Sequence, residues 1–387
     1  MSKKTSLILL SALLLRLLLM PWFAHEDIFS DYRRAEQMAF ANQSVFGVIT
    51  IVPHFIETIN LKFFSLFLGN NIFKVVHLEL IDQTSINSLL FIFKLPYLVA
   101  EILIWWLFIK FFKPTTKILL LLVFNPITIY SVYLFGRYES FIMLFTLLVM
   151  LAIKQNKKLL AGIIMAINLL SKVSLALVLP AFIFLKYSKK ELLKLTILAI
   201  IPAIIFQSWL VPRAITLLGG QHFGYLLASN LKIGPLSINL FSLFYLTSLL
   251  IMYRLSFKNS QLKDLEKFSL ATVLLLFSYY ITSLFHPHYF TWVIIPMLYL
   301  MNQLEKNQPL VNIFVLLNLF FFGWLLYWDG FTNIGLLFPI FSNFITVNPQ
   351  SLVVVDLQTT AYLAKNIMAG LMIYFAFLLV KHYRKSK

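Results

Sequence analysis

Twelve apolar stretches, separated by short polar segments, restrict what this chain of 387 residues can fold into. An α-helix needs about 20 apolar residues to cross the hydrocarbon core of a bilayer, and most of these stretches approach that length. The composition agrees, because 60% of the residues are hydrophobic and only 12% are charged, against about 25% in soluble domains. These features exclude a water-soluble globule and a disordered chain. They predict an all-α, polytopic transmembrane helical bundle with about 11–13 spans.

The spans are expected near residues 5–22, 88–109, 118–135, 139–153, 158–171, 173–185, 195–211, 235–253, 268–285, 288–303, 309–327 and 360–380. The first is interpreted as a retained span rather than a cleaved signal peptide, because Arg16 interrupts it and Trp22-Phe23-Ala24 is a poor cleavage site. The pair 158–171 and 173–185 is expected to form two half-length helices that meet at Ser171-Lys172. Residues 1–387 are thus predicted to form a single transmembrane domain.

The basic residues orient these spans, because cytoplasmic loops retain lysine and arginine. If the N-terminus is cytoplasmic, 21 of the 32 lysines and arginines fall on that side, in segments 1–4, 110–117, 154–158, 186–194, 254–267, 306 and 381–387. The pattern requires that the apolar stretch 53–68 does not cross. We therefore expect 23–87 to be one large outer loop with juxtamembrane helices, with 53–68 re-entrant or interfacial, and 88–380 to hold the remaining spans. The pattern therefore predicts a multi-pass protein of the cell membrane, with both termini on the cytoplasmic side.

The acidic residues collect on the opposite face. Ten of the 15 carboxylates fall in outer segments or at the outer boundary, namely Glu26, Asp27, Asp31, Glu36, Glu57, Glu79, Asp82, Glu139, Asp329 and Asp356. Random loops would not sort them in this way, so chemistry is expected on the outer face. The net charge of +17 mostly records topology. No nucleic-acid partner is expected, because that would require a basic patch with interleaved aromatic residues on a soluble fold.

The densest group of charges, His25-Glu26-Asp27 to Glu36, directly follows the first span. A helix is predicted from Asp31 to about Ala41, capped by Ser30 or Asp31. If it extends upstream, Asp27 and Asp31 share a face, because they are four residues apart. Two interpretations stay open: a solvated juxtamembrane helix, or carboxylates that act as a general base or as metal ligands.

A second group is the corner Gly136-Arg137-Tyr138-Glu139-Ser140, which follows Asn125-Pro126. Placing an arginine and a glutamate beside hydrocarbon costs free energy unless the two side chains pair or bind a ligand. Either they pair to fix the hairpin, or Arg137 faces an anionic phosphate while Glu139 holds a sugar hydroxyl or the loop.

Other candidate groups lie at a helix break, at a tight corner and inside the spans. Lys172, at the break, suits a phosphate or snorkels to the interface. His288 suits a phosphate contact or a position at the membrane interface better than a metal. The intramembrane charges Lys94 and Glu101 are functional candidates by default, but a packing ion pair with Arg16 explains them equally well.

Several catalytic signatures are absent from the sequence. There is no Walker-type phosphate loop, no HExxH and no GxSxG, and zero cysteines exclude disulfides and thiol chemistry. An enzyme driven by hydrolysis of a cytoplasmic nucleotide is therefore not expected. Any reaction would draw its energy from an activated, lipid-linked substrate.

The order of these motifs resembles the GT-C superfamily of membrane glycosyltransferases. The likeness is to the catalytic subunit family of GPI mannosyltransferase I and to its prokaryotic polyprenyl-phosphate-mannose-dependent relatives. It covers roughly residues 5–300, on Glu26-Asp27 with Asp31-Tyr32, Asn125-Pro126, Gly136 to Ser140, Ser171-Lys172 with Pro180, and His288-Tyr289-Phe290-Thr291-Trp292. One motif departs from the family, since the eukaryotic enzymes carry a spaced Asp-x-Asp where this chain has adjacent Glu26-Asp27. The identity of the base and any metal dependence stay open for that reason.

The resemblance implies an inverting transferase of a sugar, mannose by likeness, from a polyprenyl-phosphate donor to a lipid or glycan acceptor. It implies a set of roles: catalytic Asp27, with Asp31 or Glu26 orienting the sugar or a divalent ion (Mg²⁺ or Mn²⁺); donor-phosphate ligands Arg137, Lys172 and His288; and substrate contacts Glu139, Tyr32 and Tyr289. The alternatives are a transporter or flippase of lipid-linked sugars, and a polysaccharide ligase or polymerase.

Overall fold

The computed structural model describes residues 2–41, 50–69, 73, 83–207, 230–233, 236–258, 262–283, 285–304, 308–325 and 357–385. Four of the ten acidic residues assigned to the outer face, Glu79, Asp82, Asp329 and Asp356, lie outside these ranges. So does the side chain of Glu26, although its backbone begins a helix.

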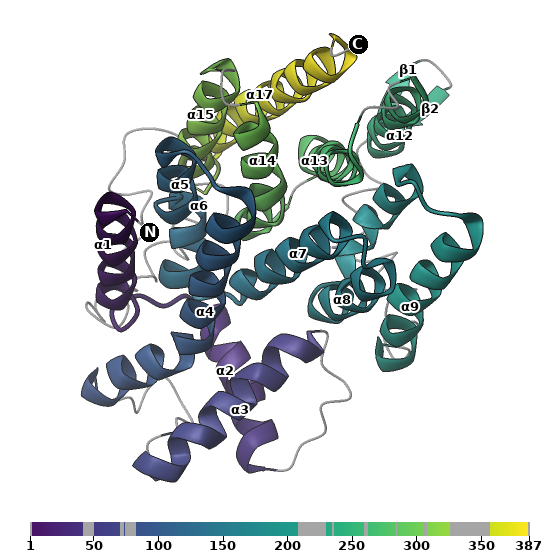
Figure 1. Cartoon of the computed structure of the whole chain (residues 1–387). Helices are drawn as coiled ribbons and strands as arrows, with labels where there is room; N and C mark the ends of the chain where they lie inside the picture. Colours follow the sequence, from purple (N-terminus) through teal and green to yellow (C-terminus); the bar gives the residue numbers. More distant parts are fainter. Residues whose placement is uncertain are drawn as a thin grey trace. The chain divides into compact units, whose positions relative to one another are not determined.

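The all-α class is confirmed for the described residues (Figure 1). The elements are α1 (Lys3–Leu19), α2 (Glu26–Phe40), α3 (Ile51–Leu68), α4 (Gln83–Phe112), α5 (Thr116–Val123), α6 (Pro126–Ile129), the π-helix η3 (Tyr130–Leu134), α7 (Glu139–Lys154), α8 (Lys158–Ser171), the 3₁₀-helix η4 (Val173–Phe184), α9 (Lys189–Gln207), α12 (Leu240–Lys258), α13 (Asp264–Thr282), the 3₁₀-helix η5 (Pro287–Phe290), α14 (Thr291–Gln303), α15 (Gln308–Leu325) and α17 (Leu357–Lys385). The described strands, β1 (Asn230–Ile233) and β2 (Leu236–Asn239), pair as one antiparallel hairpin.

Six described helical stretches are long and apolar enough to cross a membrane: Ile51–Leu68, Ile86–Phe112, Thr116–Leu134, Asp264–Thr282, Gln308–Leu325 and Thr359–Arg384. Five of them overlap predicted spans. The sixth, α3, is the stretch that the charge pattern keeps out of the bilayer, and its 18 residues make it a candidate span by length and composition. These six helices indicate a multi-pass membrane protein. The larger span count and the orientation stay predictions.

Helix α1 illustrates why these helices suit lipid. Leu7, Leu10, Leu14 and Leu18 recur every three or four residues and are each more than half exposed, whereas Arg16 is completely buried. A stripe of this kind would be unusual on the surface of a soluble monomer. In hydrocarbon it is the expected arrangement, because the apolar face contacts lipid and the charge turns inward.

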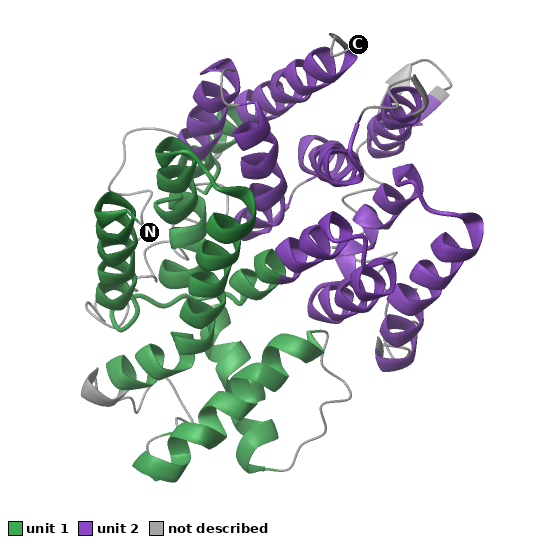
Figure 2. Cartoon of the chain, in the orientation of Figure 1, with its two compact units in different colours: residues 1–144, 321–364 green, residues 145–320, 365–387 purple. Residues whose placement is uncertain are grey.

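The described structure divides into two compact units (Figure 2). Unit 1 comprises residues 1–144 and 321–364, and unit 2 comprises residues 145–320 and 365–387. In unit 1, α2 packs along α3, α3 against α4, and α1 against α5. In unit 2, α8 packs along α9, while α13 packs against α12, α14 and η4.

The helix break predicted at Ser171-Lys172 is confirmed. Helix α8 ends at Ser171, Lys172 has an extended backbone, and η4 begins at Val173. The second half is a 3₁₀-helix rather than an α-helix and contains Pro180, which lacks the amide hydrogen that an α-helix would use there.

Candidate active site

Helix α2 begins five residues earlier than predicted, and neither Ser30 nor Asp31 caps it. The cap is His25, whose Nδ1 accepts a hydrogen bond from the Asp27 amide at 3.1 Å and whose ring stacks on Phe135 at 3.9 Å. Histidine is outside the usual set of capping residues, which explains the error. The upstream extension places Asp27 and Asp31 four residues apart on the same helix.

Asp31 lies at the centre of a group of charges in unit 1. Its side chain is fully buried, and Arg137 Nη1 donates to its Oδ2 at 2.8 Å. Arg34 Nη1 lies 3.4 Å from its Oδ1. Asp27 is more open, with 38% of its side chain exposed and its Oδ2 3.8 Å from Arg137 Nη1. The carboxylates of one helix face and the arginine of the Gly136 corner, about a hundred residues apart, therefore form one cluster.

Burial dominates the electrostatics of this cluster. It raises the pKa of Asp31, and the positive charges of Arg137 and His54 oppose that rise. Burial is the largest single influence on the pKa of Arg137 and acts to lower it, but the neighbouring groups Asp31, Tyr138, Asp27 and Glu139 together outweigh burial and hold that pKa above its ordinary value. Burial also lowers the pKa of His25 from 6.5 to about 4, so its ring is neutral when it caps α2.

Two side chains from α3 and one from α4 extend the cluster behind Asp31. His54 Nε2 lies 3.8 Å from Asp31 Oδ1, and His54 Nδ1 lies 2.7 Å from Glu57 Oε2. Tyr97 donates its hydroxyl hydrogen to Glu57 Oε1 at 2.5 Å. Neither His54 nor Tyr97 was predicted from the sequence as a site residue. A histidine and a glutamate three residues apart in an otherwise apolar helix were the available signal.

The corner that carries Arg137 is fixed by its own backbone. Asn125 Oδ1 accepts from the Thr128 amide at 2.9 Å and so caps α6, from which η3 leads into the corner. Gly136 has φ +84°, and a Cβ there would lie 2.6 Å from Ile28 Cδ1. The Arg137 amide then donates to the Ser131 carbonyl at 2.9 Å. Only glycine allows the corner to approach α2 this closely.

The guanidinium of Arg137 retains binding capacity. It lies 4.9 Å from the Tyr138 ring centroid, and its side chain is 13% exposed. Within the described residues, its buried Nε has no hydrogen-bond partner. A buried donor of this kind calls for an explanation, and a ligand is one.

Two other predicted substrate contacts, Tyr32 and Glu139, are buried in unit 1. Tyr32 is buried and donates to the Phe73 carbonyl at 2.5 Å, which ties α2 to the chain beyond α3. Glu139, in the first turn of α7, is completely buried, as is Ser140.

The remaining predicted residues gather in unit 2. Lys172 Nζ lies 4.4 Å from the centroid of the Tyr289 ring, which stacks on Trp292 at 4.5 Å. His288 is buried and touches Tyr289 edge-on at 4.6 Å. The break at Lys172 and the η5 corner thus form a second cluster, which brings together Lys172, His288 and Tyr289.

The intramembrane charges form closed structural contacts in unit 1. Arg16 binds Glu101 through two nitrogens, Nη2 at 2.7 Å and Nε at 3.2 Å, and Tyr133 donates to the same carboxylate at 2.5 Å. Lys94 Nζ donates to three backbone carbonyls, those of Met20, Phe23 and Tyr133. The packing ion pair with Arg16, left open in the sequence, is confirmed for Glu101.

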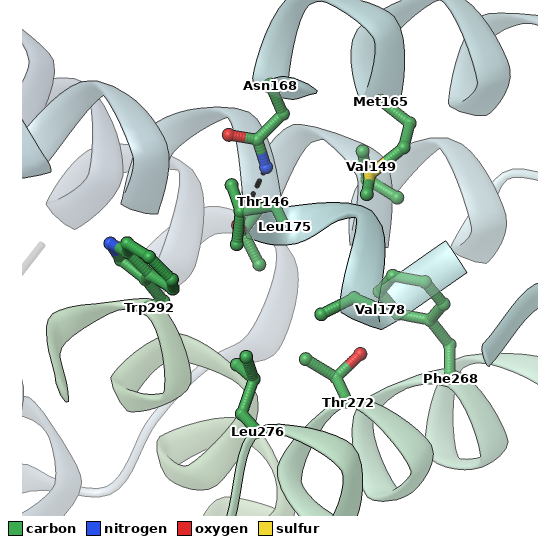
Figure 3. A pocket seen from close by; sticks show the side chains of 10 residues that line it. All are labelled: Thr146, Val149, Met165, Asn168, Leu175, Val178, Phe268, Thr272, Leu276 and Trp292. Atoms are coloured by element: carbon green, nitrogen blue, oxygen red, sulfur yellow. Dashed lines mark hydrogen bonds between the residues drawn. The ribbon is translucent and has the colours of Figure 1, made fainter. Parts of the chain in front are cut away.

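Among the described residues, no group of three or more His, Asp or Glu side chains could hold a metal ion. A cavity in unit 2 is lined mostly by apolar side chains, with Asn168 Nδ2 donating to Thr146 Oγ1 at 3.1 Å (Figure 3). It has space for about one water molecule, which is too little for a sugar.

Comparison of the chain with protein-family models, with curated proteins and with solved structures finds no match.

Proposed function

We propose that the protein is an integral-membrane glycosyltransferase of the GT-C type. It would move a sugar, mannose by resemblance, from a polyprenyl-phosphate donor to a lipid or glycan acceptor. The observation that supports this best is the cluster in which a buried Asp31–Arg137 ion pair lies beside the partly exposed Asp27. It combines a carboxylate that a substrate can reach with a cation that retains binding capacity.

The burial of the two aspartates assigns them different roles in this proposal. Asp27 is accessible, and a general base must reach the hydroxyl that it deprotonates. Asp31 is fully buried and bonded to Arg137, so it orients the arginine rather than touching the sugar. Glu26 stays a candidate from the sequence alone.

The proposed reaction is a single displacement at the anomeric carbon of the donor sugar. The acceptor oxygen attacks the anomeric carbon while Asp27 takes its proton. The bond from that carbon to the phosphate oxygen breaks on the opposite face, and its electron pair leaves with the lipid phosphate. The configuration therefore inverts. Arg137 would neutralise the charge that grows on the phosphate, and fixed cations at such a position are usually the largest catalytic contribution.

The other assignments rest on the resemblance. Lys172, His288 and Tyr289 belong to unit 2, and their roles toward the donor phosphate and sugar are carried over from the motif order. Counting shorter helices such as α1, α7, α8, η4, α12 and α14 as additional spans gives the expected 11–13, with the first-loop cluster on the non-cytoplasmic face of the cell membrane. Mg²⁺ or Mn²⁺ dependence stays open.

The test is sugar transfer by purified protein in liposomes that contain a radiolabelled polyprenyl-phosphate mannose and a membrane-lipid extract as acceptor. Asp27→Asn should abolish transfer, whereas Asp264→Asn, which removes an aspartate that caps the Lys186 amide, should not. If Asp27→Asn and Asp31→Asn both keep full transfer, the assignment to the first loop is wrong.

The same assay separates the alternatives. Movement of the labelled lipid across the bilayer without a new glycosidic bond would favour a transporter or flippase. Transfer of whole preassembled glycans, with no transfer of the single sugar, would favour a ligase or polymerase.

A further inference from the structure

Seven lysines gather at one end of unit 2, where α8 and α9 begin. They are Lys154, Lys157, Lys158, Lys186, Lys189, Lys190 and Lys194, and the same two segments, 154–158 and 186–194, contain one carboxylate, Glu191. The structure brings these segments together, because Lys158 Nζ lies 2.9 Å from Glu191 Oε1. This end of the unit therefore carries a local excess of positive charge, which attracts anions.

Helices α8 and α9 lie side by side and run parallel (Figure 1). Lys158 and Glu191, near the two helix starts, are in contact, and about one turn further on Gly162 meets Leu195. A Cβ added to Gly162 would lie 3.2 Å from the Leu195 carbonyl oxygen, so the small residue lets the two backbones approach closely. Both helix N-termini, with their partial positive charge, thus lie at the lysine-rich end.

The contact between Gly162 and Leu195 also determines which residues share a face of the helix pair. At about 100° per residue from that contact, five exposed residues project to the same side: Leu159 and Ile163 of α8, and Lys194, Ile201 and Ile205 of α9. We call this set the α8–α9 face. Its four apolar side chains are between 45% and 63% exposed. An apolar surface of this kind marks a contact with lipid or with another apolar molecule.

Two lysines lie at the N-terminal end of the α8–α9 face. Lys194 belongs to it, and Lys190 lies one turn earlier on the same helix. Both side chains are exposed, and neither forms an ion pair with a described residue. Long lysine stems can cover apolar surface while the ammonium group stays at the water boundary. The two charges therefore lie where the headgroups of a bilayer meet its hydrocarbon.

The carboxylates near this end do not neutralise the two lysines. Each of the three that are described already has a donor: Glu191 has the Lys158 ammonium, Asp264 the Lys186 amide and Glu266 the Lys263 amide. The partner that fits Lys190 and Lys194 is consequently an anion from outside the described chain.

We propose that the α8–α9 face binds an anionic phospholipid. Its phosphate lies at Lys190 and Lys194, and an acyl chain runs along the leucine and isoleucine side chains. Basic sites beside membrane helices recognise lipid headgroups in this way. A zwitterionic lipid fits less well, because its own cation meets the same lysines. A soluble anion leaves the apolar side chains unused. None of these residues belongs to the proposed catalytic clusters, so the inference does not rest on glycosyl transfer.

The experiment measures lipid binding by the purified full-length protein in a non-ionic detergent. Phosphatidylglycerol and phosphatidylcholine with identical acyl chains are titrated separately, and native mass spectrometry gives the affinity for each. Lys194→Gln is compared with Lys189→Gln, because Lys189 is also exposed but projects to the opposite side of α9. Ile163→Trp is compared with Leu160→Trp, because Leu160 is 42% exposed but projects away from α9.

The wild type should bind phosphatidylglycerol more tightly than phosphatidylcholine. Each lysine near an anionic group accounts for about a fivefold gain in affinity, so Lys194→Gln should lose about fivefold and the double variant Lys190→Gln, Lys194→Gln about 30-fold. Ile163→Trp should weaken binding of both lipids, because the larger ring occupies the path of the acyl chain. Lys189→Gln and Leu160→Trp should keep the wild-type affinities.

Equal binding of the two lipids by the wild type would overturn the inference and leave the lysines as topology signals alone. Equal losses in Lys194→Gln and Lys189→Gln would show a diffuse attraction to charge instead of a site. Glycerol 3-phosphate should not raise the melting temperature, and stabilisation as large as that by phosphatidylglycerol would identify a soluble anion as the occupant. If the double lysine variant does not fold, the pair Ile163→Trp and Leu160→Trp decides the question.

Discussion

Unit 1 contains two buried arginine–carboxylate clusters built from the same three chemical groups. In the closed cluster, Arg16, Glu101 and Tyr133, the arginine binds both carboxylate oxygens, and its guanidinium also lies 5.0 Å from the Trp105 ring centroid. In the open cluster, formed by Asp27, Asp31, His54, Glu57, Tyr97 and Arg137, a tyrosine again holds a carboxylate, but Arg137 bonds Asp31 through one nitrogen.

The two arginines differ in how many of their hydrogen-bond donors the fold already uses. The side chain of Arg16 has no exposed surface, and its three nitrogens all donate within the fold. Among the described residues, Nε of Arg137 donates to nothing, and Asp27 beside it reaches solvent. Intramembrane charge alone therefore does not indicate function. A satisfied cluster holds helices together, and an unsatisfied one can bind a ligand.

Lys94 belongs with the closed cluster by this criterion. An ammonium group has three donors and no acceptor, and each donor of Lys94 meets a backbone carbonyl, at Met20, Phe23 or Tyr133. These carbonyls belong to the end of α1, to the linker into α2 and to η3. Lys94 thus joins the segments that lead to the two halves of the open cluster.

The largest expected effect comes from breaking the closed cluster. Arg16→Met leaves Glu101 buried without its cation, which should destabilise the protein by about 3–5 kcal/mol. Thermal unfolding in detergent measures the loss. The double variant Arg16→Met, Glu101→Leu should recover most of the stability and also sugar transfer. Failure of the double variant to recover stability would show that the cluster does more than hold helices.

The open cluster should respond differently when its arginine is replaced alone and then together with the carboxylate that it binds. Arg137→Gln should lower transfer by about 10²–10³-fold, the usual loss for one fixed donor at developing charge. The double variant Arg137→Gln, Asp31→Asn should recover stability but not transfer, because the ligand-facing cation stays absent. Recovery of both properties would place Arg137 with the closed cluster and remove it from the proposed site.

Lowering the pH should destabilise the protein by protonating His25, which caps α2 beside the open cluster. Burial lowers its pKa from 6.5 to about 4, so below pH 6.5 the unfolded chain binds a proton that the folded chain does not. The stability that depends on a neutral His25 is complete above pH 6.5 and is lost as the pH falls toward 4, by about 3 kcal/mol in all.

His25→Asn provides the measurement, because asparagine also caps helices. The melting temperature of the variant should fall less than that of the wild type between pH 6.5 and 4. Taking the difference between the two proteins removes the contribution of Asp31, whose pKa is raised by burial. Parallel curves would mean that protonation of His25 does not open the cap.

Much of the fold could be predicted from the sequence, because apolar length and breaks in it are local properties. The helix break at Lys172 and the shared face of Asp27 and Asp31 follow from spacings of a few residues. The pairing of Arg16 with Glu101 could be named only as one option, since 85 residues separate the partners.

The open cluster could be predicted only in part for the same reason. Asp27, Asp31 and Arg137 stand out because charge is rare in this chain. Their contact, and the presence of His54 and Tyr97, depend on how α2, α3 and α4 pack, which spacing within one helix does not reveal. The start of α2 was missed because its cap is a histidine side chain.

The smallest expected effect separates backbone strain from close packing at the corner that carries Arg137. An alanine at Gly136 would adopt a positive φ and also meet Ile28, at a cost of about 1–3 kcal/mol. Gly69 offers a matched control, because it too has a positive φ, of +77°, but nothing lies within 4 Å of an added Cβ. Gly370 has neither the positive φ nor a neighbour.

Melting temperature should therefore fall most for Gly136→Ala, less for Gly69→Ala and not at all for Gly370→Ala. Only Gly136→Ala should also lower transfer, because displacement of the corner moves Arg137 away from Asp31. Ile28→Ala removes the atom nearest to the added Cβ and should restore part of both properties to Gly136→Ala. If Gly136→Ala and Gly69→Ala behave alike, the close approach to Ile28 does not determine the position of Arg137, and the open cluster depends on its ion pairs alone.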